Sequence, residues 1–255
     1  LVRIEMFAHG ALCMAVSGKC YLSLQTYGAS ANRGACYQLC RRGYEVTDLE
    51  TGTKLNIDNK YIMSPKDLCT IEFMDKIIDA GVKVFKIEGR ARSAEYVKKT
   101  AECYRRAADA VCEGRYTPEL AASLKEGLSE VFNRGFWDGY YQGARLGEWS
   151  DVYGSHATRK KIYCGKITNW FDRISVAEVL VESEALRKGD DILIIGETTG
   201  VIEQNVSEIR VDLKPTEEAV KGTLCSIPVI FPDDIRTPGG KKIRRGDKVF
   251  IWSEV

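Results

Sequence analysis

The feature that most constrains this chain is the placement of its cysteines. Nine cysteines occur in 255 residues, and five of them fall within the first 69 positions: Cys13, Cys20, Cys36, Cys40 and Cys69. An odd number of cysteines with no visible secretion signal argues against a disulfide framework. The other four lie in periodic segments, where a free cysteine serves as a small core residue: Cys103, Cys112, Cys164 and Cys225. We therefore expect a cytoplasmic protein whose thiols stay reduced.

The early cysteines lie in glycine-rich, loop-like sequence. Residues 2–8 alternate as a β-strand, and Gly10 ends that strand. Cys13 and Cys20 follow on the loop that leaves its carboxyl end, which is the side where α/β folds place their chemistry. Cys36 lies in a second loop, "NRGACYQLC". Thiols in such loops are available to bind a metal.

A fourth thiol comes from a predicted helix. Ser64 is a suitable N-cap with proline next to it, so Cys69 is expected in the first helical turn, where the helix N-terminus favours the thiolate. The irregular spacing of this set differs from the paired knuckles of a structural zinc site. It is more typical of an iron–sulfur cluster held from several loops, here by Cys13, Cys20, Cys36 and Cys69.

Hydrophobic periodicity divides the chain into two parts. The first part, residues 1–155, alternates strand and helix and predicts α/β structure with parallel strands. Its expected elements are strands at 2–8 and 82–87, a hairpin at 43–49 and 54–57, and helices at 64–80, 93–113 and 117–131. Two parallel strands cannot close a sheet. We therefore expect a piece of a longer protein, completed by a companion segment or by a homodimer.

The second part, residues 156–255, is all-β by its pattern. Six short alternating runs predict a small closed β-barrel, at 161–167, 174–181, 191–196, 200–211, 223–231 and 248–253. No apolar run approaches the roughly 18 residues that cross a bilayer, so we expect no membrane partner.

Four more residues are candidates for catalysis. His9 has three interpretations: a satisfied strand-end histidine, a residue that handles substrate or protons, or a metal ligand. Lys86, Glu88 and Arg90 alternate at the end of the strand at 82–87. Arg90 could hold a phosphate or a carboxylate. The alternative is a solvated strand end with an internal ion pair.

Several runs together resemble the collagenase-like, U-thirty-two peptidase family. They are "EMFAHGALCMAVSGKCYLS", "NRGACYQLCR", "YIMSPKDLC" and "FKIEGRARSAEYV", and the similarity extends over residues 3–145. The resemblance implies a TIM-like (β/α) barrel whose seventh and eighth strands are residues 2–8 and 82–87. The C-terminal part is similar to the appended domain of this family and to the barrel of translation factors.

The resemblance also implies a cofactor and a reaction. Several family members hold a four-iron, four-sulfur cluster, which would bind here to Cys13, Cys20, Cys36 and Cys69, with zinc possible in its place in purified protein. Some relatives have a cysteine at the position of Cys40 and lack the one that matches Cys69. Members are named as proteases, or they hydroxylate RNA bases or quinones without oxygen, some of them using prephenate.

The residues weigh against proteolysis, because the sequence has neither a G-x-S-x-G elbow nor an H-E-x-x-H helix. We expect hydroxylation of an RNA base, the wobble uridine of tRNA, by an enzyme most similar to the group that acts there. The alternatives are a peptidase and a metal-stabilised RNA-binding module without catalysis. Since the net charge is only +1, tRNA binding would depend on basic clusters at 159–161 and 241–245, which a small barrel could unite in one patch.

Overall fold

A computed structural model of the chain describes residues 2–15, 18–55, 64–144, 147–151, 154–231 and 243–255. The end of the predicted hairpin at 56–57 and the basic residues Lys241 and Lys242 lie outside these ranges. The chain divides into two compact units, residues 1–157 and 158–255, and each is described by itself. None of the helices in the described ranges is long and apolar enough to cross a membrane.

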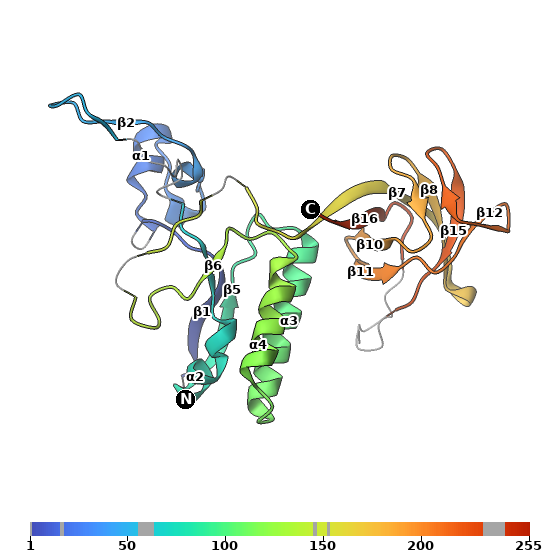
Figure 1. Ribbon diagram of the computed structural model, residues 1–255, viewed down its shortest axis with the longest axis horizontal. Helices are drawn as coiled ribbons and strands as arrows, with labels where there is room; N and C mark the ends of the chain where they lie inside the picture. The colour runs from blue at the N-terminus through green and yellow to red at the C-terminus, as the bar shows by residue number, and fades with distance from the viewer. Residues whose placement is uncertain (1, 16–17, 56–63, 145–146, 152–153, 232–242) are drawn as a thin grey trace. The chain divides into compact units, whose positions relative to one another are not determined.

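The first unit is built on a four-stranded mixed sheet with the order β5-β1-β4-β6 (Figure 1). The central strand β1 (Ile4–Ala11) runs parallel to β5 (Val82–Ile87), as the sequence predicts. On its other side, β1 pairs antiparallel with β4 (Asp67–Cys69), which pairs in turn with β6 (Phe136–Trp137). The mixed α/β character is thus confirmed, whereas the described strands do not form a TIM barrel.

Two long helices cover this sheet, and both match the predicted ranges. The helices α3 (Ala94–Cys112) and α4 (Pro118–Ser129) lie side by side (Figure 1). The helix α4 begins where the Thr117 hydroxyl accepts a hydrogen bond from the Leu120 amide at 3.2 Å, with proline at the first position. Both helices contribute buried side chains to one core with the sheet, among them Cys103, Tyr104, Leu124 and Leu128.

The helix predicted at 64–80 is wrong over its first half. Residues 67–69 form β4, a 3-10 turn follows as η4 (Ile71–Phe73), and only then does α2 (Met74–Asp79) begin. The reason is burial: all three β4 residues are buried, which a strand between β1 and β6 allows and a surface helix does not. Cys69 is therefore not at a helix N-terminus, and its Cα pairs with that of His9 across the two strands.

Short elements replace much of the predicted cysteine-bearing loops: α1 (Tyr21–Tyr27), η2 (Ala31–Arg33) and η3 (Leu39–Arg41). The hairpin predicted after them is present, as β2 (Val46–Thr47) paired with β3 (Lys54–Leu55). Gly28 and Gly34 end α1 and η2 in the left-handed region, at φ 59° and 94°. These tight endings fold the cysteine-rich segment back on itself.

The second unit is the β-rich part that the sequence predicts. Its main sheet has eight strands in the order β11-β10-β16-β7-β8-β15-β12-β13. Their bounds are β7 (Arg159–Phe171), β8 (Val176–Val181), β10 (Asp191–Gly196), β11 (Gly200–Asn205), β12 (Ile209–Val211), β13 (Lys214–Thr216), β15 (Leu224–Pro228) and β16 (Lys248–Glu254). A short η5 (Asp172–Ile174) and the small pair β9 (Leu186–Arg187) and β14 (Glu218–Ala219) complete it.

The sheet has an apolar core, to which alternate residues of β8 and β15 and three consecutive residues of β10 contribute buried side chains. Gln204 on β11 connects this strand to the end of β15. Its side chain donates to the Pro228 carbonyl at 2.8 Å and accepts from the Ile230 amide at 3.0 Å. These side-chain bonds link β11 to the end of β15, whereas the strand pairing of the described residues stays open between β11 and β13 and does not close the predicted barrel.

The described parts of the two basic clusters lie apart, because Arg244 and Arg245 are at the opposite end of β7 from Arg159, while Lys241 and Lys242 lie outside the described residues. In the β7–β16 pair, Arg159 faces Glu254, whereas the Gly246 amide bonds the Ile167 carbonyl. Eight residues of extended strand separate those positions, which is about 26 Å. Arg159 is also engaged, with its guanidinium 2.7 Å from an Asp191 carboxylate oxygen.

Candidate metal centre

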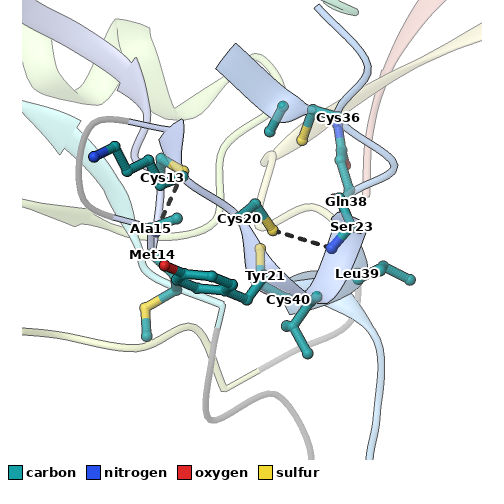
Figure 2. Close-up of a pocket in the computed structure, with 13 residues that line it drawn as sticks. Cys13, Met14, Ala15, Cys20, Tyr21, Ser23, Cys36, Gln38, Leu39 and Cys40 are labelled. Carbon is teal, nitrogen blue, oxygen red and sulfur yellow. Dashed lines mark hydrogen bonds between the residues drawn. The ribbon is translucent and has the colours of Figure 1, made fainter. Parts of the chain in front are cut away.

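Four cysteines of the first unit surround one cavity of about 420 Å³ (Figure 2). Each comes from a different part of the segment that follows β1. Cys13 lies just after the strand, Cys20 precedes α1, Cys36 lies between η2 and η3, and Cys40 is in η3. The structure therefore brings together three of the four predicted ligands, with Cys40 beside them.

Backbone amides point at two of these sulfurs. Cys20 is the N-cap of α1, and its Sγ accepts a hydrogen bond from the Ser23 amide at 3.4 Å. The pKa of the Cys20 thiol is lowered, first by a hydrogen bond from the Ser23 side chain and then by this bond from the Ser23 amide. The Sγ of Cys13 accepts in the same way from the Ala15 amide at 3.4 Å. Donors aimed at sulfur favour the thiolate, which is the form that binds metal.

Cys40 shows that the four sulfurs interact with one another. Burial is the main reason that its pKa is raised, and the negative charges of Cys13, Cys36 and Cys20 raise it further. Only the neighbouring Arg41 guanidinium acts in the opposite direction. Loss of all four thiol protons would gather mutually repelling charges, so the arrangement favours a cationic group that offsets them.

Cysteine sulfurs of this kind can bind a single metal ion or an iron–sulfur cluster. In the described part of the chain, no three His, Cys, Asp or Glu residues are grouped so that they could hold a single metal ion. A tetrahedral zinc would need all four sulfurs about 2.3 Å from one point. Thiols spread around a cavity of about 420 Å³ fit a larger group, and four cysteines from several loops are the usual donor set of an iron–sulfur cluster.

Cys69 does not join the other predicted ligands. Its side chain is buried in β4, where Sγ lies 3.9 Å from the Tyr104 hydroxyl, and it does not line the cavity. Burial raises the pKa of the Cys69 thiol to about 11. The sequence predicts Cys69 as a ligand because it places this residue on the first turn of a helix. The structure has a buried strand at that position.

His9 has the surroundings of a satisfied core histidine. It is 1% exposed, its Nδ1 lies 3.3 Å from the Tyr104 hydroxyl, and its ring packs against those of Tyr96 and Phe136. Burial, with a smaller contribution from Arg92, lowers the His9 pKa to about 3. The neutral ring therefore belongs to the sheet core. It does not line the cavity of the four cysteines or a second, adjacent cavity described below.

This histidine predicts a pH dependence of stability. The unfolded chain binds a proton at His9 below pH about 6.5, whereas the folded chain stays neutral down to about 3, so stability falls as the pH drops through that window. Between pH 7 and pH 5 we expect His9 to remove about 2 kcal/mol from the free energy of unfolding of the first unit.

The measurement is hydrogen exchange of the β1 and β4 peptides at pH 7 and pH 5, in wild type and His9→Gln. His156→Gln, at the other histidine of this unit, serves as the matched control. The same acid sensitivity in wild type and His9→Gln would contradict this account of His9.

A second cavity of about 260 Å³ shares three of the cysteines, Cys13, Cys36 and Cys40. Its other lining includes Glu88, Arg90, Arg41 and Arg134. The Glu88 carboxylate accepts from the Arg90 amide at 2.7 Å, and the Arg90 guanidinium donates to the Gly34 carbonyl of the cysteine segment. Glu88 and Arg90 thus lie beside the thiols, whereas the predicted candidate Lys86 is exposed and lines neither cavity.

Sequence reasoning missed a buried ionic group next to this site. The Asp67 carboxylate, 1% exposed, lies 3.2 Å from Arg92 and 3.4 Å from Arg134. The Arg92 guanidinium also packs over the Phe132 ring, 4.2 Å from its centre. The quoted run "FKIEGRARSAEYV" contains Arg92, but nothing in the sequence links it to Asp67 or Arg134.

Arg41 ties the cysteine segment to the sheet. Its guanidinium donates to the Leu12 carbonyl at 2.7 Å, the Pro65 carbonyl at 2.6 Å and the Ser64 hydroxyl at 2.9 Å. Leu12 precedes Cys13, and Arg41 itself follows Cys40. One side chain therefore fixes two of the four thiol-bearing turns against the start of β4.

Comparison with known proteins gives a family and several relatives. The sequence model described as peptidase family U32 matches residues 1–151. A Porphyromonas gingivalis protein named collagenase is 58% identical over 99% of this chain, which spans 59% of that protein. The Bacillus subtilis tRNA hydroxylation protein P1 is 33% identical over 76% of this chain and 47% of its own length. An Escherichia coli 23S rRNA 5-hydroxycytidine synthase is 40% identical over 57% of this chain and 23% of its own length.

Proposed function

The chain belongs to peptidase family U32, and from this premise we propose that it hydroxylates an RNA base without oxygen, at an iron–sulfur centre. The wobble uridine of tRNA is the proposed base, in the cytoplasm. Relatives named for tRNA and rRNA hydroxylation support RNA as the substrate. The observation that carries the proposal is the set of four thiols around one cavity, because base oxidation needs a redox centre and this is its usual donor set.

In this proposal the cluster ligands are Cys13, Cys20, Cys36 and Cys40. Cys40 replaces Cys69 because it lines the cavity with the other three. A bound four-iron, four-sulfur cluster would supply one-electron chemistry, and zinc could replace it in purified protein. All nine cysteines are free, which suits a reducing cytoplasm.

We further propose that the second cavity takes a small carboxylate, such as prephenate. Arg41 and Arg134 both lie close enough to Arg92 and Asp67 for their charges to interact, so three guanidinium groups share one buried carboxylate. The lining of the second cavity has three guanidinium groups, those of Arg41, Arg90 and Arg134, and one carboxylate, that of Glu88. This excess of positive charge favours an anion, and a planar guanidinium matches a carboxylate in two hydrogen bonds. Arg90 would provide the exposed side of the site, with Glu88 accepting a hydrogen bond from the substrate.

The barrel fold of the resemblance also remains a proposal. The strand β5 is an edge of the four-stranded sheet, with unpaired backbone groups of the kind that another strand covers. The chain spans 59% of its collagenase-named relative. We propose that this unit is the C-terminal part of a TIM-like barrel and that a companion N-terminal segment, or a second copy, pairs with β5.

A peptidase is the second candidate, because the Porphyromonas gingivalis relative is named a collagenase. A cysteine protease needs a reactive thiolate beside a basic imidazole. His9 and Cys69 are neighbours across β1 and β4, but burial lowers the His9 pKa to about 3 and raises that of Cys69 to about 11. This pair can form neither group at neutral pH.

The test is the nucleoside composition of tRNA from cells that lack the protein. We expect loss of a hydroxylated uridine, restored by the wild-type gene and not by a variant lacking Cys40. An unchanged nucleoside profile would contradict the proposed reaction. Peptide cleavage by the metal-replete protein would favour the peptidase, and tRNA binding without turnover would favour a binding module.

Arg41 gives a further prediction. Arg41→Lys keeps the charge, but one ammonium cannot reproduce the fork that reaches Leu12 and Pro65 together. We expect all four thiols to remain and the bound iron to be lost to a chelator at least about ten times faster. Arg33→Lys, in the same segment, is the control, and equal rates for both variants would contradict the positioning role of Arg41.

A further inference from the structure

The second unit has a polar cavity of its own, of about 600 Å³, at the end of β7. Its lining residues are Thr168, Asn169, Trp170, Glu178, Ile243, Arg244 and Arg245. We propose that this cavity, the Trp170 site, binds a single-stranded segment of RNA. The inference rests on the proposed function for the identity of RNA as the substrate, and adds to it a second point of contact.

The two arginines are held outward on a rigid turn. The Asp247 carboxylate accepts from the Arg244 amide at 2.8 Å and from the Thr199 hydroxyl at 2.5 Å. The turn is also bonded to β7 through Ile167. The Ile167 amide donates to the Asp247 carbonyl, and the Gly246 amide donates to the Ile167 carbonyl, both at 2.8 Å. Because Asp247 is buried and these bonds fix the backbone, the exposed Arg244 and Arg245 side chains start from a fixed position.

Several other cations of the unit form ion pairs. Arg187 and Arg210 each lie 2.6 Å from a glutamate, and Lys166 and Lys188 are paired as well. Neither guanidinium of Arg244 and Arg245 has a carboxylate partner among the described residues. Unpaired exposed guanidinium groups are available for phosphates without first breaking an ion pair.

Trp170 provides a fixed aromatic surface beside them. Its indole N–H donates to Asp172 at 3.1 Å, and its ring meets that of Phe231 edge-on, with 5.6 Å between ring centres. The ring is partly exposed. The side-chain Oδ1 of Asn169 accepts from the Trp170 backbone amide at 2.9 Å, which leaves the side-chain Nδ2 of Asn169 to donate to a base.

An acidic side chain limits where phosphates could lie. Glu178 lines the same cavity, and its carboxylate accepts from the Thr168 hydroxyl at 2.6 Å. A phosphate would therefore lie at the Arg244 and Arg245 end, with a base stacked on Trp170. An aromatic surface next to unpaired cations is the usual arrangement of proteins that bind single strands.

The test uses the full chain and tRNA binding over a series of salt concentrations. Replacing both Arg244 and Arg245 by alanine should reduce the slope of log K against log salt by about 1.4, at about 0.7 for each single-strand phosphate contact. The control replaces Arg187 and Arg210 by alanine, which removes the same charge from paired positions and should leave the slope unchanged.

A second measurement follows Trp170 directly. Octauridylate should quench tryptophan fluorescence in wild type and much less in Trp170→Phe, while Trp170→Ala should weaken octauridylate binding about tenfold. Wild-type tRNA affinity and slope in the double arginine variant would overturn the Trp170 site and leave RNA as the substrate intact. Absence of tRNA binding by wild type at any salt would overturn the proposed function as well. Quenching by an acidic peptide and not by octauridylate would make this a peptide site and refute the proposal.

Discussion

Replacing Cys40 by alanine is expected to remove the bound iron, whereas replacing Cys69 by alanine should leave it in place. Cys40 lines the cavity with Cys13, Cys20 and Cys36, and its thiol interacts electrostatically with all three. Cys69 is buried in β4 beside Tyr104, outside that cavity. The measurement is iron and sulfide per chain after anaerobic purification of each variant.

Cys103→Ala is the matched control, because Cys103 is also a buried core cysteine of this unit. Both core variants should lose some stability, of the order of 1 kcal/mol for the small cavity created, while keeping their iron. If Cys69→Ala loses iron and Cys40→Ala retains it, the ligand assignment is reversed.

Replacing Asp67 by asparagine is expected to cost about 3–5 kcal/mol of the free energy of unfolding of the first unit. Asp67 is the one carboxylate between Arg92 and Arg134, at 3.2 Å and 3.4 Å, and all three side chains are largely buried. Asparagine keeps the shape but leaves two guanidinium groups without their counter-charge, and an uncompensated buried charge is strongly destabilising.

Urea denaturation followed by hydrogen exchange of the β4 and α3 peptides measures this loss. Asp79→Asn removes the same charge from an exposed position of the same unit and should change stability by less than about 0.5 kcal/mol. A similarly small effect of Asp67→Asn would show that the ionic group contributes little to the fold.

Local sequence patterns were enough to predict much of the fold. The helices α3 and α4 have periodic apolar faces, and Thr117 with Pro118 marks the start of α4. Some strands of the second unit alternate inward and outward, as β8 does over all six of its residues. These signals lie within each element, so no tertiary information was needed to read them.

The predictions that are wrong share one physical cause, which is pairing between segments far apart in the sequence. Leu68, Ile71 and Met74 keep helical spacing, yet pairing with β1 and β6 makes residues 67–69 a strand. As a result, Cys69 is buried in the core, and Cys40 lines the cavity with the other three cysteines. The Asp67, Arg92 and Arg134 group was missed for the same reason, since only the folded sheet brings these segments together.

In our proposal the first unit binds an iron–sulfur cluster through Cys13, Cys20, Cys36 and Cys40. The iron and acid-labile sulfide content of the wild-type protein, purified without oxygen, tests this directly. We expect iron and sulfide in equal amounts, about four of each per chain, and their loss when any one of the four cysteines is replaced. Iron-free protein that still hydroxylates tRNA at the full rate would contradict it.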